Sequence, residues 1–136
     1  MGRKIKSTVD YFPHDCNQKK TLFILKSRYG NDGYAFWYQL LEILGKTEGH
    51  SIDCNDKSSW LFLTAETGIN DDIKANDILN LLSEMGTIDS QLWENRIIWC
   101  QNFVERLIEV YRRRHLELPK KPVFVDINKI KWRIYL

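Results

Sequence analysis

The sequence has 136 residues, of which 43% are hydrophobic and 28% charged, and these proportions are typical of one globular domain. No apolar run reaches the roughly 18 residues of a transmembrane helix, and the basic N-terminus lacks the apolar stretch of a signal peptide. Three widely spaced cysteines, Cys16, Cys54 and Cys100, are typical of a reducing compartment rather than of a disulfide framework. We therefore expect a cytoplasmic protein that does not contact a membrane.

The net charge of +2 is unevenly distributed along the chain. Residues 1–28 contain seven basic and two acidic residues, and residues 112–136 contain eight basic and two acidic residues. Residues 29–111 contain five basic and fourteen acidic residues, a net charge of −9. The sequence thus predicts basic ends that flank an acidic body, and we expect a polyanion to be attracted to the ends.

An extended arm and two helices are expected in the first third of the chain. Pro13 disfavours helical backbone at the preceding residue, so residues 1–16 are expected to form an arm whose aromatic residues pack on the body. A first helix is expected to be capped by Asp15 or Asn17 and to end near residue 29. Glycines at 30 and 33 are expected to break it before a central helix over residues 34–46.

A strand and two further helices are expected next. Residues 50–54 favour a short strand, and a helix capped by Asp56 or Ser58 is expected to end at Gly68. The following helix should span residues 71–85 and end at Gly86. Its apolar residues recur at helical spacing: Ile78, Leu81, Leu82 and Met85.

Residues 87–100 are expected to form a compact two-stranded wing. Thr87 and Ile88 would provide one strand, and the β-branched and aromatic run over residues 97–100 favours the other. Residues 92–96 would either extend the wing or form one helical turn at its tip, since Asp89 and Ser90 are good N-caps. The order of helix, turn, helix and hairpin predicts a helix-turn-helix with a wing.

The chain is expected to close with a helix over residues 101–115, which ends in three arginines. Pro119 and Pro122 forbid its continuation, and residues 116–136 are a basic and apolar tail, either a strand or the start of a linker to a further domain. We predict a fold that is mainly α with a small β-hairpin, a winged helix-turn-helix with extra N- and C-terminal helices. Residues 1–115 would form this domain.

Two runs of residues carry a resemblance to a known family. They are KIK at residues 4–6 with DYFPHD at residues 10–15, and YGNDGY at residues 29–34, which opens the helix containing Leu40 and Leu41. Over roughly residues 4–115 the ordered pattern resembles the N-terminal winged-helix domain of phage and Gram-positive replisome-organiser proteins, which are related to DnaD-like primosomal proteins. The resemblance implies a replication-initiation module that binds origin DNA or other initiation proteins and commonly self-associates.

Candidate DNA contacts come from the basic ends and from the helix over residues 71–85. That helix exposes Asn side chains that can hydrogen-bond to adenine edges, but its net charge of −3 disfavours reading of a major groove. We therefore expect phosphate contacts mainly from the ends. The candidate residues are Arg3, Lys4, Lys6, Lys19, Lys20, Lys26, Arg28, Lys74, Asn76, Asn80, Arg112, Arg113 and Arg114.

Other classes of site find little support in the sequence. His14, Cys16, His50 and Cys54 include types of residue that bind zinc, but the paired C-x-x-C spacing of structural zinc sites is absent. No phosphate-binding glycine loop, nucleophile elbow or paired-carboxylate motif occurs, so we expect neither an enzyme nor a cofactor. Trp93 and Trp132 are expected to be the exposed tryptophans.

Two alternatives to DNA binding stay open. A protein-interaction or oligomerisation module of the replication machinery is favoured by the acidic body and the apolar tail, with a homo-oligomer and replication proteins as the expected partners. A winged-helix transcriptional regulator is the other alternative, because the same fold serves both roles.

Overall fold

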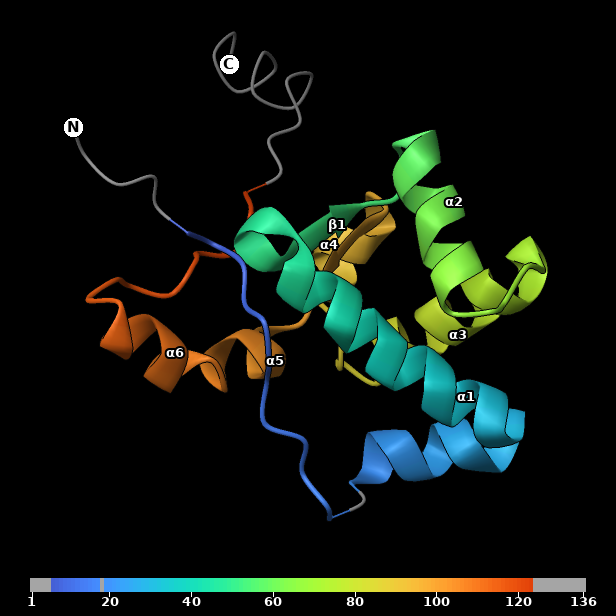
Figure 1. The fold of residues 1–136 in the computed structure, drawn as a ribbon. Helices are drawn as coiled ribbons and strands as arrows, with labels where there is room; N and C mark the ends of the chain where they lie inside the picture. The colour runs from blue at the N-terminus through green and yellow to red at the C-terminus, as the bar shows by residue number, and fades with distance from the viewer. Residues whose placement is uncertain (1–5, 18, 124–136) are drawn as a thin grey trace, which may run out of the picture.

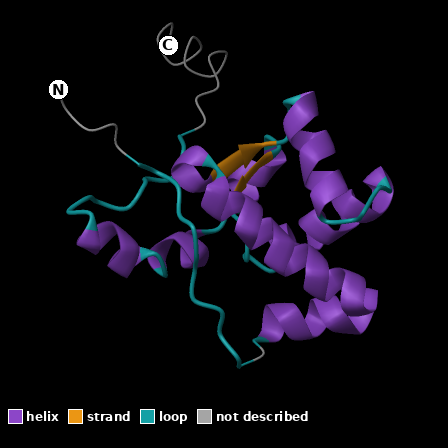
Figure 2. Cartoon of the chain, in the orientation of Figure 1, coloured by secondary structure: helices purple, strands orange, loops and turns teal. Residues whose placement is uncertain are grey.

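The computed structural model describes residues 6–17 and 19–123. Within these residues the fold is mainly helical with one small antiparallel sheet, as the sequence predicts (Figures 1 and 2). The elements in chain order are α1 (Lys20–Lys46), the 3-10 turn η1 (Glu48–His50), β1 (Ser51–Asp53), α2 (Lys57–Glu66), α3 (Asp72–Glu84), α4 (Ser90–Glu94), β2 (Ile97–Trp99), α5 (Gln101–Glu105) and α6 (Ile108–Arg113).

Helix α1 is bent at Gly30 into two parts, residues 20–29 and residues 31–46. Gly30 has φ of 61° and ψ of −141°, backbone angles that essentially only glycine adopts, and the chain reverses direction there (Figure 1). A Cβ at Gly33 would lie 2.4 Å from the carbonyl oxygen of Leu25, so the two parts pack closely only because residue 33 is glycine. The predicted break between two helices is therefore confirmed.

The predicted beginning of α1 is wrong by several residues. Neither expected cap acts on the helix: the N-cap is Lys19, which has no side-chain hydrogen bond to the first turn. The carboxylate of Asp15 instead accepts a hydrogen bond of 2.9 Å from the backbone N–H of Asn17. This local turn competes with the helix for the same residues.

The small sheet joins β1 to β2, with Ile52 opposite Ile98. The expected hairpin over residues 87–100 is wrong in its first strand, because Thr87 and Ile88 lie in no strand. The N–H of Asp89 donates a single hydrogen bond of 2.9 Å to the carbonyl oxygen of Trp99. The next residues form α4, whose first turn is capped by Asp89, so the alternative of a helical turn at the tip is confirmed.

Aspartates begin the two middle helices and glycines follow their ends, as predicted. Asp56 accepts a hydrogen bond from the N–H of Ser59 at the start of α2, and Asp71 accepts from the N–H groups of Ile73 and Lys74 in α3. Gly68 and Gly86 both have φ of 72°, the left-handed conformation that commonly ends a helix.

The expected single helix over residues 101–115 is two short helices, α5 and α6. The interruption lies at Leu107, whose N–H bonds to the carbonyl oxygen of Val104, three residues back. The tighter turn keeps the Leu107 side chain fully buried. Leu107 therefore stays in the core although the helix is interrupted at this residue.

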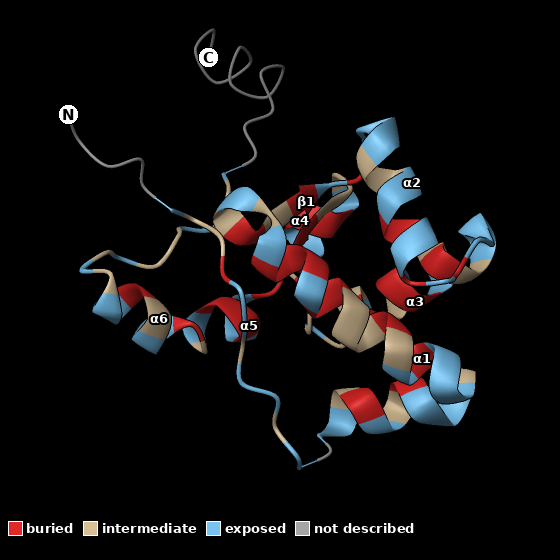
Figure 3. Cartoon of the chain, viewed as in Figure 1, coloured by how far each residue is buried: buried red, intermediate tan, exposed pale blue. Residues whose placement is uncertain are grey.

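Buried side chains line the facing sides of α1, α3, α4, β2 and α5 (Figure 3). Trp93 belongs to this core, with only 6% of its surface exposed, so its expected exposure is wrong. Its indole N–H donates a hydrogen bond of 2.8 Å to the side-chain oxygen of Asn80. Trp132 lies outside the described residues.

The N-terminal arm docks on the body, as predicted. Val9 is 3% exposed, and its N–H bonds to the carbonyl oxygen of Gly45 at 2.8 Å. Further along the arm, the ring of Phe12 packs edge-on against Phe103, with ring centres 5.4 Å apart. The arm therefore joins α1 to α5. In the part of the chain that the structure describes, no helix combines the length and the apolar character needed to cross a membrane.

Candidate nucleic-acid interface

The first part of α1 presents the most uniformly basic surface among the predicted contact segments. Residues 19–29 contain Lys19, Lys20, Lys26 and Arg28 and no acidic residue. Phe23 lies among them and exposes 64% of its surface. Since Lys19, Lys20 and Lys26 are four and three residues before it and three after it, they share its helix face. An exposed aromatic ring is thus surrounded by positive charge.

Lys19 belongs to a loose cluster of charges beside this surface. Its amine lies 3.9 Å from the carboxylate of Asp15, which also lies 3.7 Å from the guanidinium of Arg106. Both separations exceed a hydrogen-bond distance, and one anion faces two cations. The cluster keeps a net positive charge.

The arginines of α6 lie beside the N-terminal arm. Arg114 donates hydrogen bonds to the carbonyl oxygens of Lys6 and Thr8, at 3.2 and 2.8 Å. Arg112 pairs with Glu109 on its own helix, and Arg113 is exposed. The structure therefore brings Lys6 and Arg114 together, but Arg114 holds the arm in place.

The other basic residues predicted as contacts near the N-terminus are Arg3, Lys4 and Lys6. Lys6 pairs with Asp10 at 3.3 Å, whereas Arg3 and Lys4 lie outside the described residues. Figure 1 shows α6 apart from the first part of α1, so the basic residues form two surfaces rather than one.

The predicted polar residues of α3 contact other parts of the protein. The Lys74 amine lies 2.9 Å from the Asp32 carboxylate, next to the bend of α1. Asn76 accepts a hydrogen bond from the guanidinium of Arg96, and Asn80 accepts one from Trp93. These side chains join α3 to its neighbours.

Arg96 was not among the predicted site residues. Its guanidinium lies 4.9 Å from the ring centre of Trp60 and 4.3 Å from that of Trp93. Contacts of this kind stabilise a cation over an aromatic face. Trp93 is only three residues before Arg96, but the contact with Trp60 has no signal in the sequence, because Trp60 is 36 residues away from Arg96.

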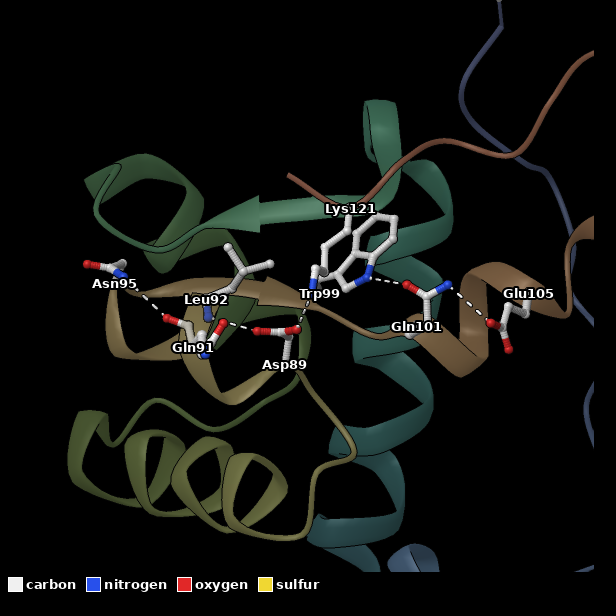
Figure 4. A network of polar contacts seen from close by, with 8 residues as sticks. All are labelled: Asp89, Gln91, Leu92, Asn95, Trp99, Gln101, Glu105 and Lys121. Atoms are coloured by element: carbon white, nitrogen blue, oxygen red, sulfur yellow. Dashed lines mark hydrogen bonds and ion pairs between the residues drawn. The ribbon is translucent and has the colours of Figure 1, made fainter. Parts of the chain in front are cut away.

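A polar network around α4 includes the basic residue Lys121. Lys121 lies 3.0 Å from the carboxylate of Asp89, which also accepts the N–H of Leu92 (Figure 4). Partial burial raises the pKa of Asp89, but these hydrogen bonds and the charge of Lys121 outweigh it, so the pKa is lowered overall. The network attaches residue 121 to the body.

His50 is fully buried and both of its ring nitrogens have protein partners. Nδ1 donates to the carbonyl oxygen of Leu44 at 2.8 Å, which leaves Nε2 to accept the hydroxyl proton of Tyr111 at 2.6 Å. Burial is the main cause of its lowered pKa. Burial also raises the pKa of the Cys54 thiol to about 12. Within residues 6–17 and 19–123, no group of three His, Cys, Asp or Glu side chains is arranged to hold a metal ion.

A pocket of about 110 Å³ opens beside Lys19 and Arg106. The arm, both parts of α1 and the α5 region form its walls, which include Phe12, Trp37 and Tyr38. Tyr38 stacks on the ring of His14 at 4.0 Å between ring centres, with 7° between the planes. Tyr34 also lies beside Tyr38, and the four-residue spacing of these two tyrosines is a sequence signal for their contact. The sequence did not reveal that the arm would dock against α5, because that contact joins distant residues.

A protein-family model matches most of the described chain. The model is described as Lin1244/Lin1753-like, N-terminal, and it matches residues 11–103. This chain belongs to that family. No curated protein and no solved structure matches the chain. The Lin1244/Lin1753-like region includes the whole of α1 with its basic first part, and it ends before α6 and its arginines.

Proposed function

We propose that this domain is a DNA-binding module of a phage or prophage replication-initiation protein and contacts phosphates through the first part of α1. One observation carries the proposal: residues 19–29 combine four basic residues, no acidic residue and an exposed Phe23. Phosphate contacts supply most of the affinity of proteins for DNA, and aromatic rings add stacking with bases. The predicted contacts Lys6 and Arg113 would add charge at the second basic surface.

Helix α3 occupies the position of a recognition helix, but its charge disfavours that role. It contains Asp72, Asp77 and Glu84 against Lys74 alone. An acidic helix is repelled by the phosphates that border a major groove. The proposed binding mode is therefore contact with the phosphate backbone rather than reading of bases by α3.

The replication role rests on the resemblance to replisome-organiser and DnaD-like domains. The helical fold with its small antiparallel sheet is consistent with such a domain. Membership of the Lin1244/Lin1753-like family is compatible with this role but does not specify it. Homo-oligomerisation and binding of other replication proteins belong to the same proposal.

A protein-interaction module is the second candidate function. Leu61 and Phe62 on α2 expose 54% and 55% of their surfaces, and Ile73 at the start of α3 exposes 75%. Leu61 and Phe62 are neighbours on α2, and exposed apolar side chains that lie close together mark a contact surface. Binding that is insensitive to salt, together with a defined oligomer, would favour this function.

The test is a fluorescence-anisotropy titration against single- and double-stranded DNA at two salt concentrations, with light scattering for mass. The first variant replaces Lys20, Lys26 and Arg28 with Ala. Loss of three phosphate contacts should lower affinity on the order of 10²-fold near 0.1 M salt and reduce the salt slope by about 2 to 3.

The matched control replaces Lys46, Lys57 and Lys120 with Ala, which removes the same charge from exposed positions elsewhere. It should lower affinity far less. Equal losses in the two variants would contradict the assignment to α1, and absence of binding by the unaltered protein at low salt would contradict DNA binding itself.

A further inference from the structure

We propose that the pocket between the arm, α1 and α5 binds a single unpaired pyrimidine base of single-stranded DNA. The inference rests on the proposed function and names the form of DNA that the domain prefers. The pocket adjoins the basic surface, since Lys19 belongs to both.

The walls of the pocket suit a flat aromatic group. Phe12 comes from the arm, whereas Trp37 and Tyr38 come from the second part of α1. Its volume of about 110 Å³ is smaller than the roughly 150 Å³ of a closed cavity that accepts benzene, so a bound ring would be only partly enclosed. Because the pocket is also open to solvent, one six-membered ring can enter edge-first while a purine would project from it.

Its rim suits the polar edge of a base and the phosphate attached to it. Lys19 and Arg106 provide two cations, and Asn102 provides an amide that can both donate and accept hydrogen bonds. Asp15 lies between the two cations at 3.9 and 3.7 Å, so it leaves the rim with a net positive charge. A strand that places a base inside thus places its phosphate against positive charge.

The aromatic wall is held in position before any ligand binds. The ring of His14 stacks on one face of Tyr38, and the tilted ring of Tyr34 lies 4.9 Å from Tyr38. Lys26 lies 5.6 Å from the centre of Tyr34, so the row continues toward the basic surface. Side chains that are already ordered lose little entropy on binding, which favours this site over an exposed flexible ring.

An abasic oligonucleotide separates this inference from the proposed function. We would titrate the protein with short oligo(dT) and with a strand of equal length whose bases are all replaced by abasic spacers. The two probes carry the same phosphates. A bound base should make oligo(dT) bind about 5 to 150 times more tightly, the range of one base stacked on aromatic side chains.

Two substitutions test the pocket itself. Tyr38→Leu removes one of the three aromatic walls and should reduce the difference between the two affinities, while the affinity for the abasic strand stays the same. Asn102→Leu, at an exposed rim position where folding should be unaffected, should do the same by narrowing the opening without adding an aromatic ring. Tyr11→Leu is the matched control, because Tyr11 is 59% exposed on the arm and does not line the pocket.

The possible results are distinct. Equal affinities of the unaltered protein for both strands would overturn the base-binding pocket and leave the proposed function in place, with an aromatic side chain of a protein partner as the alternative occupant. Failure of both strands to bind would overturn the pocket, and failure of duplex DNA to bind at low salt as well would overturn the proposed function.

Discussion

The first part of α1 and helix α3 are both amphipathic segments with one face on the surface, but they differ in charge and in what their polar side chains contact. The polar residues of α3 contact Asp32, Arg96 and Trp93 of this same domain. The basic residues of α1 surround an exposed phenylalanine and point to solvent.

The position of a helix in the fold therefore does not fix its role. Helix α3 follows a tight turn after α2, as a recognition helix does, yet its side chains stabilise the packing of α4 and of residue 96. The candidate binding surface lies instead on a helix that precedes the helix-turn-helix. Function is therefore argued from the side chains of a surface rather than from its place in the topology.

The largest effect on stability and on DNA binding is expected from a substitution that displaces the first part of α1. In Gly33→Ala, the new Cβ would lie 2.4 Å from the Leu25 carbonyl oxygen, so the two parts of α1 must separate. We expect a loss of about 3 kcal/mol in the free energy of unfolding, the upper end for overpacking, and weaker DNA binding. Urea denaturation measures the first and anisotropy the second.

Ser27→Ala is the control for this substitution, because Ser27 is an exposed residue of the same helical part. It should leave both quantities nearly unchanged. A Gly33→Ala protein with full stability would show that the close approach at the bend is not needed.

A second substitution tests whether the polar side chains of α3 stabilise the domain or contact DNA. Asn80→Ala removes the acceptor of the buried Trp93 indole N–H, which should lower the free energy of unfolding by about 1 to 3 kcal/mol. Affinity for DNA should stay the same, since Asn80 acts within the domain. Exposed Asn70, between α2 and α3, is the control position. A variant that folds stably but binds DNA weakly would return α3 to the interface.

The smallest expected effect is a dependence of stability on pH that comes from His50. Burial lowers the pKa of His50 in the folded state below its unfolded value of about 6.5, so the unfolded chain binds more protons below that pH. Stability should therefore be complete above pH 6.5 and fall as the pH decreases, by at most about 1.4 kcal/mol per unit. Denaturation at pH 7.5, 6.5 and 5.5 measures this slope.

His50→Gln should abolish the slope while lowering stability at every pH. A slope that persists in this variant would assign the pH dependence to another group. Binding by α1 and α3 variants is accordingly best compared above pH 7, where the His50 contribution is constant.

The sequence predicted those parts of the fold that local chemistry determines. Asp56 caps a helix, glycines at 68 and 86 end helices, and Gly30 interrupts α1, because capping and left-handed backbone depend on residues that are close in sequence. The docking of the arm also followed from its proline and aromatic residues.

The errors arose where distant residues decide the outcome. The strand at residues 97–99 was correctly placed, but its partner is β1 from before α2, whereas a local hairpin was expected. Trp93 was expected at the surface but is buried. Its hydrogen-bond partner, Asn80, lies on another helix, so the residues near Trp93 in the sequence give no signal for the burial. For the candidate site, the basic residues could be named from the sequence, but the pocket formed by three distant segments could not.

The arm has a mechanical consequence. It is attached to the body by the Val9 N–H at Gly45, by the Ser7 carbonyl oxygen at Gly49 and by the two bonds from Arg114. Tension applied at residue 6 would load these few bonds before it reached the helices. Release of the arm under force would uncover Phe103 and the side of α1 at Gly45 on which Val9 packs, and would remove the two bonds that Arg114 of the α6 end makes to the arm.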